Sequence, residues 1–227
     1  MGPLLLAGGA EFGGGMAELD LRAIQLAGGF EAPIRILPTA AAPDNNQSRA
    51  GNNGIRWFRS LGARDVQVVE VIDQPSANDP HLTAILQEAH LIYLLGGFPE
   101  YLAVTLADSL AWKAALIAHL AGAVLAGSSA GAMVLCEDYY DPYVKRLLPG
   151  LNLVHKACVL PHHNNFGKTW VSKLSGRLPD SVLVGIDEAT GMISEEEGWK
   201  VYGAGSVTLY RGGQSAGIFS HDDVFNL

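Results

Sequence analysis

Short apolar runs alternate with segments of helical periodicity along most of this chain. The runs are apolar at every position, not at every second one, which is typical of strands that are covered on both faces. We expect strands at residues 4–7, 34–37, 66–72, 91–95, 123–126, 157–160 and 182–186. Apolar residues at helical spacing predict helices between them, at residues 16–26, 52–61, 82–89, 106–120 and 170–178.

This repetition of strand and helix predicts an α/β fold of three layers, with a mostly parallel sheet and helices on both of its faces. The C-terminal part differs, since short runs at 191–194, 199–203 and 206–210 are separated by turn residues and predict an antiparallel edge. We expect no further hairpin after residue 210. No linker or internal repeat interrupts the pattern, so residues 1–227 are interpreted as a single domain.

Glycine is unusually frequent, with 27 glycines among 227 residues. Three glycine sites, Gly8-Gly9, Gly96-Gly97 and Gly127, fall at the C-terminal ends of expected strands. In open α/β sheets ligands bind outside these strand ends, and glycine lets the backbone turn sharply and approach a ligand closely. The glycine pattern therefore predicts a site at this edge of the sheet.

Charge and cysteine content exclude several classes of protein. The formal net charge is −8 and we find no basic stripe, which argues against a nucleic-acid partner. Cys136 and Cys158 provide no disulfide framework. We find no secretory leader and no apolar run long enough to span a membrane, so we expect a cytoplasmic protein without a membrane partner. No cofactor and no metal are expected.

The sharpest chemical signal is the segment Gly127-Ser128-Ser129-Ala130-Gly131, which matches G-x-S-x-G. An expected strand precedes it and a helix-forming run follows, as in a nucleophile elbow. In such a turn Ser129 is presented at the N-terminus of a helix, where the N–H of Ala130 and a second donor can hold an oxyanion. The pattern predicts that Ser129 is a nucleophile.

A serine nucleophile needs a histidine base that is oriented by an acid. His162 directly follows the strand at 157–160, and Asp187 and Glu188 follow the strand at 182–186, all at the predicted edge. Two arrangements are open: Ser129 with His162 and one of these acids, or Ser129, Asp187 and His221 in the chain order of α/β-hydrolases.

The sequence resembles the peptidase E and cyanophycinase family of serine peptidases, whose fold is like that of class I glutamine amidotransferases. The resemblance spans nearly the whole chain. It is carried by Leu6-Ala7-Gly8-Gly9-Ala10-Glu11, Leu95-Gly96-Gly97, Gly127-Ser128-Ser129-Ala130-Gly131-Ala132, Pro161-His162 and Gly185-Ile186-Asp187-Glu188, in this order.

The resemblance implies a triad in which Ser129 is the nucleophile and His162 the general base. Glu188 aligns best with the third member, Asp187 is the alternative, and an acid between the elbow and the histidine (Glu137, Asp138 or Asp141) is a third possibility. The backbone N–H groups of Gly97 and Ala130 would form the oxyanion hole. The implied activity is hydrolysis of small peptides.

The sequence also departs from the family. Cyanophycinases carry arginines after the histidine, and this chain has His163-Asn164-Asn165-Phe166-Gly167-Lys168 there, which argues against cyanophycin as substrate. Peptidase E enzymes cut dipeptides that begin with aspartate and need a cationic or amide-rich pocket. The candidates for such amides are Asn45, Asn46, Asn52, Asn53, Asn164 and Asn165. Cleavage of Asp-X dipeptides is therefore a hypothesis.

Three rival interpretations remain at this stage. His155, Cys158, His162 and His163 could hold a metal, although their spacing is not a usual zinc pattern. The glycine-rich residues 8–15 could bind a nucleotide, although they match neither common phosphate-binding motif. A catalytically silent binding module of the same fold is the third. Formation of a homodimer is left open.

Overall fold

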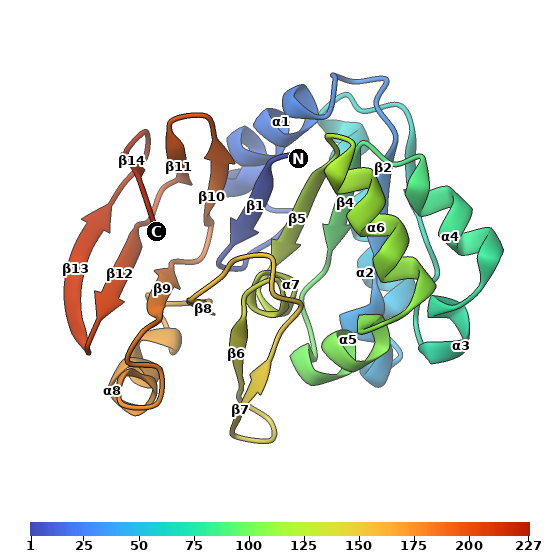
Figure 1. Ribbon diagram of the computed structural model, residues 1–227. Coiled ribbons are helices and arrows are strands. Elements are labelled where there is room, and N and C mark those ends of the chain that lie inside the picture. Colours follow the sequence, from blue (N-terminus) through green and yellow to red (C-terminus); the bar gives the residue numbers. More distant parts are fainter.

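The computed structural model describes residues 1–227, and a large central sheet dominates it (Figure 1). Its strands lie in the order β14-β11-β10-β1-β5-β4-β2-β3. The parallel strands are β1 (Leu4–Ala7), β2 (Ile34–Leu37), β3 (Val66–Val68), β4 (Leu91–Leu94) and β5 (Val124–Ser128). The antiparallel edge consists of β10 (Thr190–Glu195), β11 (Gly198–Gly203) and β14 (Val224–Phe225).

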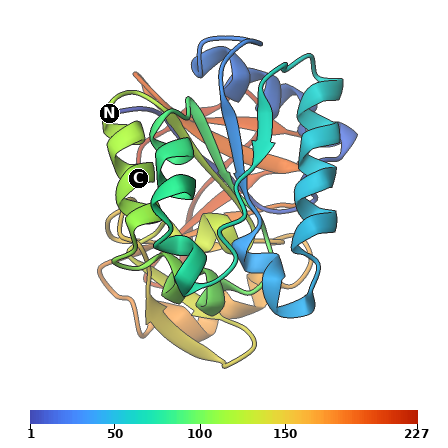
Figure 2. The ribbon, with the colours of Figure 1, turned by 90° about the vertical axis from the view of Figure 1, so that its right-hand side faces the viewer.

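Helices cover both faces of this sheet, as Figure 2 shows from the side. One face carries α1 (Ala17–Leu26) and α2 (Gln47–Ser60), and the other α3 (Gln74–Ala77), α4 (Pro80–Gln87), α5 (Pro99–Leu106) and α6 (Leu110–Leu120). Successive strand residues point to opposite faces. Leu4 and Leu6 of β1 accordingly belong to the core under α4 and α6, whereas Leu5 and Ala7 belong to the core under α1 and α2.

A second, smaller sheet lies beside the first and has the order β13-β12-β9-β8. Its strands are β8 (Ala157–Leu160), β9 (Val182–Ile186), β12 (Val207–Arg211) and β13 (Gln214–Phe219). A separate hairpin is made of β6 (Asp138–Asp141) and β7 (Arg146–Pro149). The remaining helices are η1 (Gly14–Met16), η2 (Thr39–Asp44), α7 (Ala130–Val134), η3 (Gly167–Trp170) and α8 (Val171–Ser175).

The predicted fold class is confirmed, with three layers, a mostly parallel central sheet and an antiparallel C-terminal edge. However, β8 and β9 pair with each other in the second sheet and do not extend the first. The helix predicted at 106–120 begins only at Leu110, as α6, and α5, which ends at Leu106, was not predicted. Asp108 separates the two helices with a φ of +59°, and Ser109 caps α6 by accepting the N–H of Trp112 at 3.0 Å.

The expectation that no hairpin follows residue 210 is wrong. Gly212 and Gly213 have φ values of +56° and +82°, and they turn the chain from β12 into β13. Two consecutive positive φ angles characterise the two-residue turns that suit a β-hairpin, and glycine adopts them without steric cost. The signal missed in the sequence was this Gly-Gly pair.

By length and composition, none of the helices on its own could cross a membrane. Taken together, α5 and α6 are long and apolar enough to do so, but the two helices are bent by 85° relative to each other. Both helices bury many of their side chains in this protein, including Leu102, Leu106 and Ala115.

Candidate active site

Ser129 stands in a sharp turn between β5 and α7. Its φ of +49° and ψ of −112° are rarely adopted by a residue with a side chain, and its N–H is held by the carbonyl of Ala7 at 3.0 Å. The turn closes so tightly that a Cβ on Gly127 would lie 2.4 Å from the carbonyl carbon of Gly131. The small residues around Ser129 are therefore required by the path of the backbone.

His162 directly follows β8, and its backbone also has a positive φ, of +48°. Its N–H donates to the carbonyl of Gly8 at 2.8 Å, which joins the end of β8 to the glycine turn after β1. A Cβ on Gly9 would lie 2.3 Å from the imidazole ring, so only glycine leaves room for it. The ring is thereby directed at Ser129, whose Oγ lies 2.9 Å from Nε2.

Glu188 completes a continuous chain of hydrogen bonds. Its Oε1 lies 2.8 Å from Nδ1 of His162, and its backbone N–H donates to Oδ1 of Asn164 at 3.1 Å. In the arrangement that suits these contacts, Nδ1–H donates to the carboxylate, and Nε2 is free to accept the proton of the serine hydroxyl. The structure therefore brings together Ser129, His162 and Glu188.

Asp187 belongs to a second, neighbouring pair. Its Oδ1 lies 3.1 Å from Nδ1 of His163, and its Oδ2 accepts the N–H of Ser206 at 2.9 Å. The other ring nitrogen of His163 lies 2.9 Å from the hydroxyl of Tyr210. The two adjacent histidines thus contact different acids, His162 with Glu188 and His163 with Asp187. Asp187 does not contact His162.

Phe166 is a site residue that the sequence interpretation missed. Its ring stacks on the imidazole of His162, with ring centroids 5.0 Å apart and an interplanar angle of 26°. The ring of Phe166 also packs against that of Trp170, with ring centroids 5.5 Å apart. The residue is 41% exposed to solvent. Phe166 thus covers one face of the imidazole. The only signal in the sequence is an aromatic residue four positions after His162.

Two backbone N–H groups near Ser129 lack an acceptor in the protein. Gly97 has a φ of +142°, and a Cβ there would lie 2.1 Å from the carbonyl oxygen of Ala40 in η2. No backbone or side-chain acceptor receives the N–H of Gly97. Ala130 is the first residue of α7, where an N–H has no partner within the helix. Both groups were singled out in the sequence as oxyanion donors.

Most of the remaining candidates lie in other contacts, and Asp138 forms no side-chain hydrogen bond or ion pair with His162. His221 pairs with Glu18 and Asp222, at 3.6 and 3.4 Å, so the arrangement Ser129, Asp187 and His221 is not assembled. Glu137 accepts the N–H of Lys156, and Asp141 accepts three backbone N–H groups, so neither faces His162. No group of three or more His, Cys, Asp or Glu side chains has the arrangement of a metal site.

Glu11 is a second residue that sequence interpretation did not single out for chemistry. It lies in the glycine turn after β1, and its Oε1 accepts the N–H of Gly96 at 3.3 Å. Burial raises the pKa of Glu11, and the Ser128 hydroxyl, the Gly96 amide and the His162 ring oppose this rise. Deeper in the protein, burial raises the pKa of Asp20 to about 7.

A cavity of about 630 Å³ opens next to Glu11. Its walls are Glu11, Phe12 and one face of α2, formed by Asn46, Arg49, Ala50, Asn53, Arg56, Trp57 and Ser60. Arg49 and Arg56 form no ion pair within the protein, although the protein as a whole carries a net charge of −8. The cavity therefore carries two arginines that form no ion pair, beside the carboxylate of Glu11.

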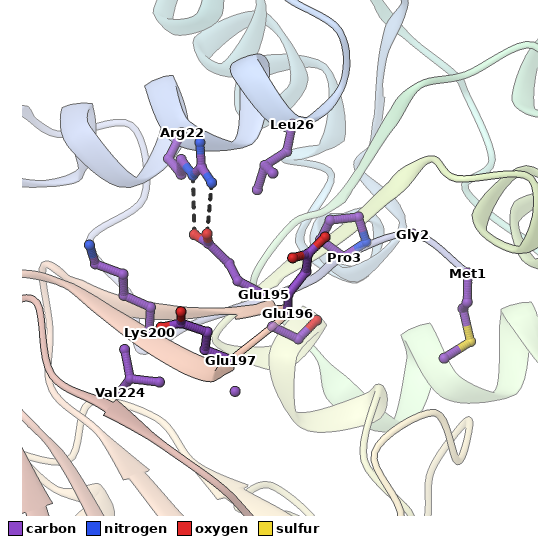
Figure 3. Close-up of a pocket in the computed structure, with 12 residues that line it drawn as sticks. Met1, Gly2, Pro3, Arg22, Leu26, Glu195, Glu196, Glu197, Lys200 and Val224 are labelled. Carbon is purple, nitrogen blue, oxygen red and sulfur yellow. Dashed lines mark hydrogen bonds and ion pairs between the residues drawn. The ribbon is translucent and has the colours of Figure 1, made fainter.

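A second hollow, of about 620 Å³, lies at the opposite, amino-terminal end of β1 (Figure 3). Arg22 reaches from α1 toward Glu195, with an ion-pair distance of 2.7 Å, and Lys200 pairs with Asp222 at 2.8 Å. Its basic side chains are thus already paired within the protein. Because the catalytic candidates follow the carboxyl ends of their strands, this hollow is not part of their site.

Comparison with known proteins identifies the family of this chain. Residues 4–201 match the family model for peptidase family S51. The chain is 29% identical over 221 residues to a cyanophycinase from Synechococcus elongatus, covering 92% of this chain and 67% of that protein. It is 27% identical over 234 residues to a cyanophycinase from Geminocystis herdmanii, covering 97% of this chain and 84% of that one.

Solved structures extend the likeness to the fold. A peptidase from an acI-B1 actinobacterium has a TM-score of 0.88 and 27% identity, covering 100% of this chain and 97% of that one. A putative peptidase E protein from Listeria monocytogenes EGD-e shares the fold, with a TM-score of 0.65 and 20% identity over 90% of this chain and 99% of that one. The resemblance seen in the sequence is confirmed: the chain belongs to peptidase family S51 and is a serine peptidase of that family.

Proposed function

We propose that this peptidase hydrolyses short peptides with Ser129 as nucleophile, His162 as general base and Glu188 as the acid that orients it. The observation that carries the proposal is the continuous chain from Ser129 Oγ through both ring nitrogens of His162 to Glu188, with contacts of 2.9 and 2.8 Å. Nucleophile, base and orienting acid at hydrogen-bond distance are what acyl transfer by a serine requires.

Each group then has a defined task in the reaction. His162 takes the hydroxyl proton at Nε2 while Ser129 Oγ attacks the carbonyl carbon of the substrate. The N–H groups of Gly97 and Ala130 hold the oxyanion, and Glu188 stabilises the imidazolium that forms. His162 returns the proton to the leaving amine. Water activated by the same ring then releases the acyl group from Ser129.

We further propose a preference for an acidic N-terminal side chain, as in Asp-X dipeptides. The proposal is supported by the unpaired Arg49 and Arg56 in the cavity beside Glu11. A guanidinium recognises a carboxylate through charge and directed hydrogen bonds. We do not extend the proposal to cyanophycin, because amides and Phe166 follow His162 where arginines would be needed.

Substitution of the nucleophile or the base tests the core of this proposal. We expect Ser129→Ala and His162→Ala each to lower kcat by about 10³-fold or more on whichever peptides of a dipeptide and tripeptide library the wild type cleaves. The exposed His81 provides a matched control, and His81→Ala should retain wild-type activity. Undiminished cleavage by Ser129→Ala would contradict the mechanism.

The two neighbouring acids should differ in their effect. Glu188→Gln removes the charge that stabilises the imidazolium, so we expect kcat to fall by about 10²- to 10⁴-fold while the thermal unfolding midpoint changes little. Asp187→Asn disturbs the contacts to His163 and Ser206, so we expect a lower unfolding midpoint and a smaller loss of kcat. A larger loss of kcat in Asp187→Asn than in Glu188→Gln would make Asp187 the third member of the triad.

The arginines of α2 should set the preference for acidic peptides. We expect the double variant Arg49→Ala/Arg56→Ala to raise KM for Asp-X dipeptides by about 3- to 10-fold relative to Ala-X dipeptides. Arg59 is also exposed on α2 but does not line the cavity, so Arg59→Ala is the control. An unchanged ratio between the two substrate classes would reject this preference and leave the catalytic proposal intact.

A further inference from the structure

Glu11 lies between the cavity beside α2 and the nucleophile. Its side chain lines the cavity. Gly96 lies next to both residues: a Cβ built on Gly96 would be 3.2 Å from Oε2 of Glu11 and 3.3 Å from Cβ of Ser129. The carboxylate and the nucleophilic residue thus contact the same glycine from two sides, so only Gly96 separates them. The other nearby carboxylate, Glu188, is already bonded to His162.

Glu11 has no ion-pair partner in the protein. No lysine or arginine forms an ion pair with it, and the arginines of the cavity stand on the exposed face of α2. Asp20, further inside, is a second acid, and its side chain accepts a single hydrogen bond, from the indole N–H of Trp57. A partly buried carboxylate without a cation is costly, so a cation brought by the substrate would be stabilised at this position.

A peptide with a free N-terminus brings such a cation to the required place. The α-ammonium nitrogen of its first residue lies about 2.5 Å from the carbonyl carbon of the same residue. When Ser129 Oγ approaches that carbon to about 3 Å, the ammonium group must also be close to Ser129. Glu11 is the carboxylate whose position suits it.

We infer that Glu11 binds the free α-ammonium group of the substrate and so restricts cleavage to the bond after the first residue. The inference rests on the proposed function and adds the residue that selects a free N-terminus. In this arrangement one oxygen of Glu11 keeps its bond to the Gly96 N–H, and the carboxylate faces the ammonium group from the inner end of the cavity. Arg49 and Arg56 remain available for the side chain of the same residue.

Glu11 could instead act only through Gly96, by fixing the loop that carries the Gly97 N–H. The two roles differ in what a neutral substitute does. In Glu11→Gln the amide oxygen can still accept the Gly96 N–H, but the negative charge is lost. A positioning role therefore survives this substitution, whereas recognition of an ammonium group does not.

The test compares peptide pairs that differ only in N-acetylation. We expect the wild type to cleave the free peptides with a kcat/KM about 10- to 100-fold above that of their acetylated forms. We expect Glu11→Gln to abolish most of this preference, mainly through KM of the free peptides. The exposed Glu88 is distant in sequence and lines no part of the site, so Glu88→Gln should keep the wild-type preference.

Every outcome separates the inference from the function on which it rests. Equal cleavage of free and acetylated peptides by the wild type would overturn the role of Glu11 and leave the serine mechanism standing. The role of Glu11 would also be overturned if Glu11→Gln kept the preference for free over acetylated peptides. The same holds if Glu11→Gln lowered kcat/KM equally for both kinds of peptide. If the wild type cleaves none of the peptides, the proposed function fails and the inference fails with it.

Discussion

The whole site depends on one ring being held in one place. The imidazole of His162 lies between the hydroxyl of Ser129 and the carboxylate of Glu188, and Phe166 stacks on its face. The space for the ring exists only because Gly9 has no side chain. Both His162 and Ser129 have positive φ angles, a conformation that costs energy and persists only when the surroundings enforce it.

The enforcement comes from the glycine turn after β1. The carbonyl of Ala7 holds the backbone of Ser129, the carbonyl of Gly8 holds that of His162, and the N–H of Gly8 binds Thr190 at the start of β10. These backbone bonds tie β5 of the central sheet and β8 of the second sheet to the end of β1. The glycines that stood out in the composition thus mark the place where the two sheets meet at the site.

Much of the fold and part of the site could be predicted from the sequence, because both depend on local patterns. Continuous apolar runs gave the buried strands, and the small residues around Ser129 indicated the elbow. The resemblance favoured Glu188 over Asp187, but the residues alone could not decide between them, since the choice depends on which side of the chain end faces His162. A shift of one residue reverses that direction.

Glu11 and Phe166 were missed for a different reason. Glu11 ends one of the motifs that carry the resemblance, but its position beside the nucleophile follows from a contact across the fold, with Gly96. Phe166 acquires its role from the turn after β8, which stacks it on the ring of His162. The start of α6 was predicted too early because Leu106 and Leu110 lie at helical spacing although Asp108 separates them. Pattern alone does not reveal a single residue such as Asp108 that leaves the helical conformation.

The central claim is that His162 activates Ser129, and covalent labelling tests it most directly. A fluorophosphonate reacts with a serine whose hydroxyl is activated by a neighbouring base, and peptide mapping by mass spectrometry locates the adduct. The account predicts a single adduct on Ser129 in the folded wild type, formed far more slowly in His162→Ala. A folded wild type that remains unlabelled, or an adduct on a different residue, would contradict it.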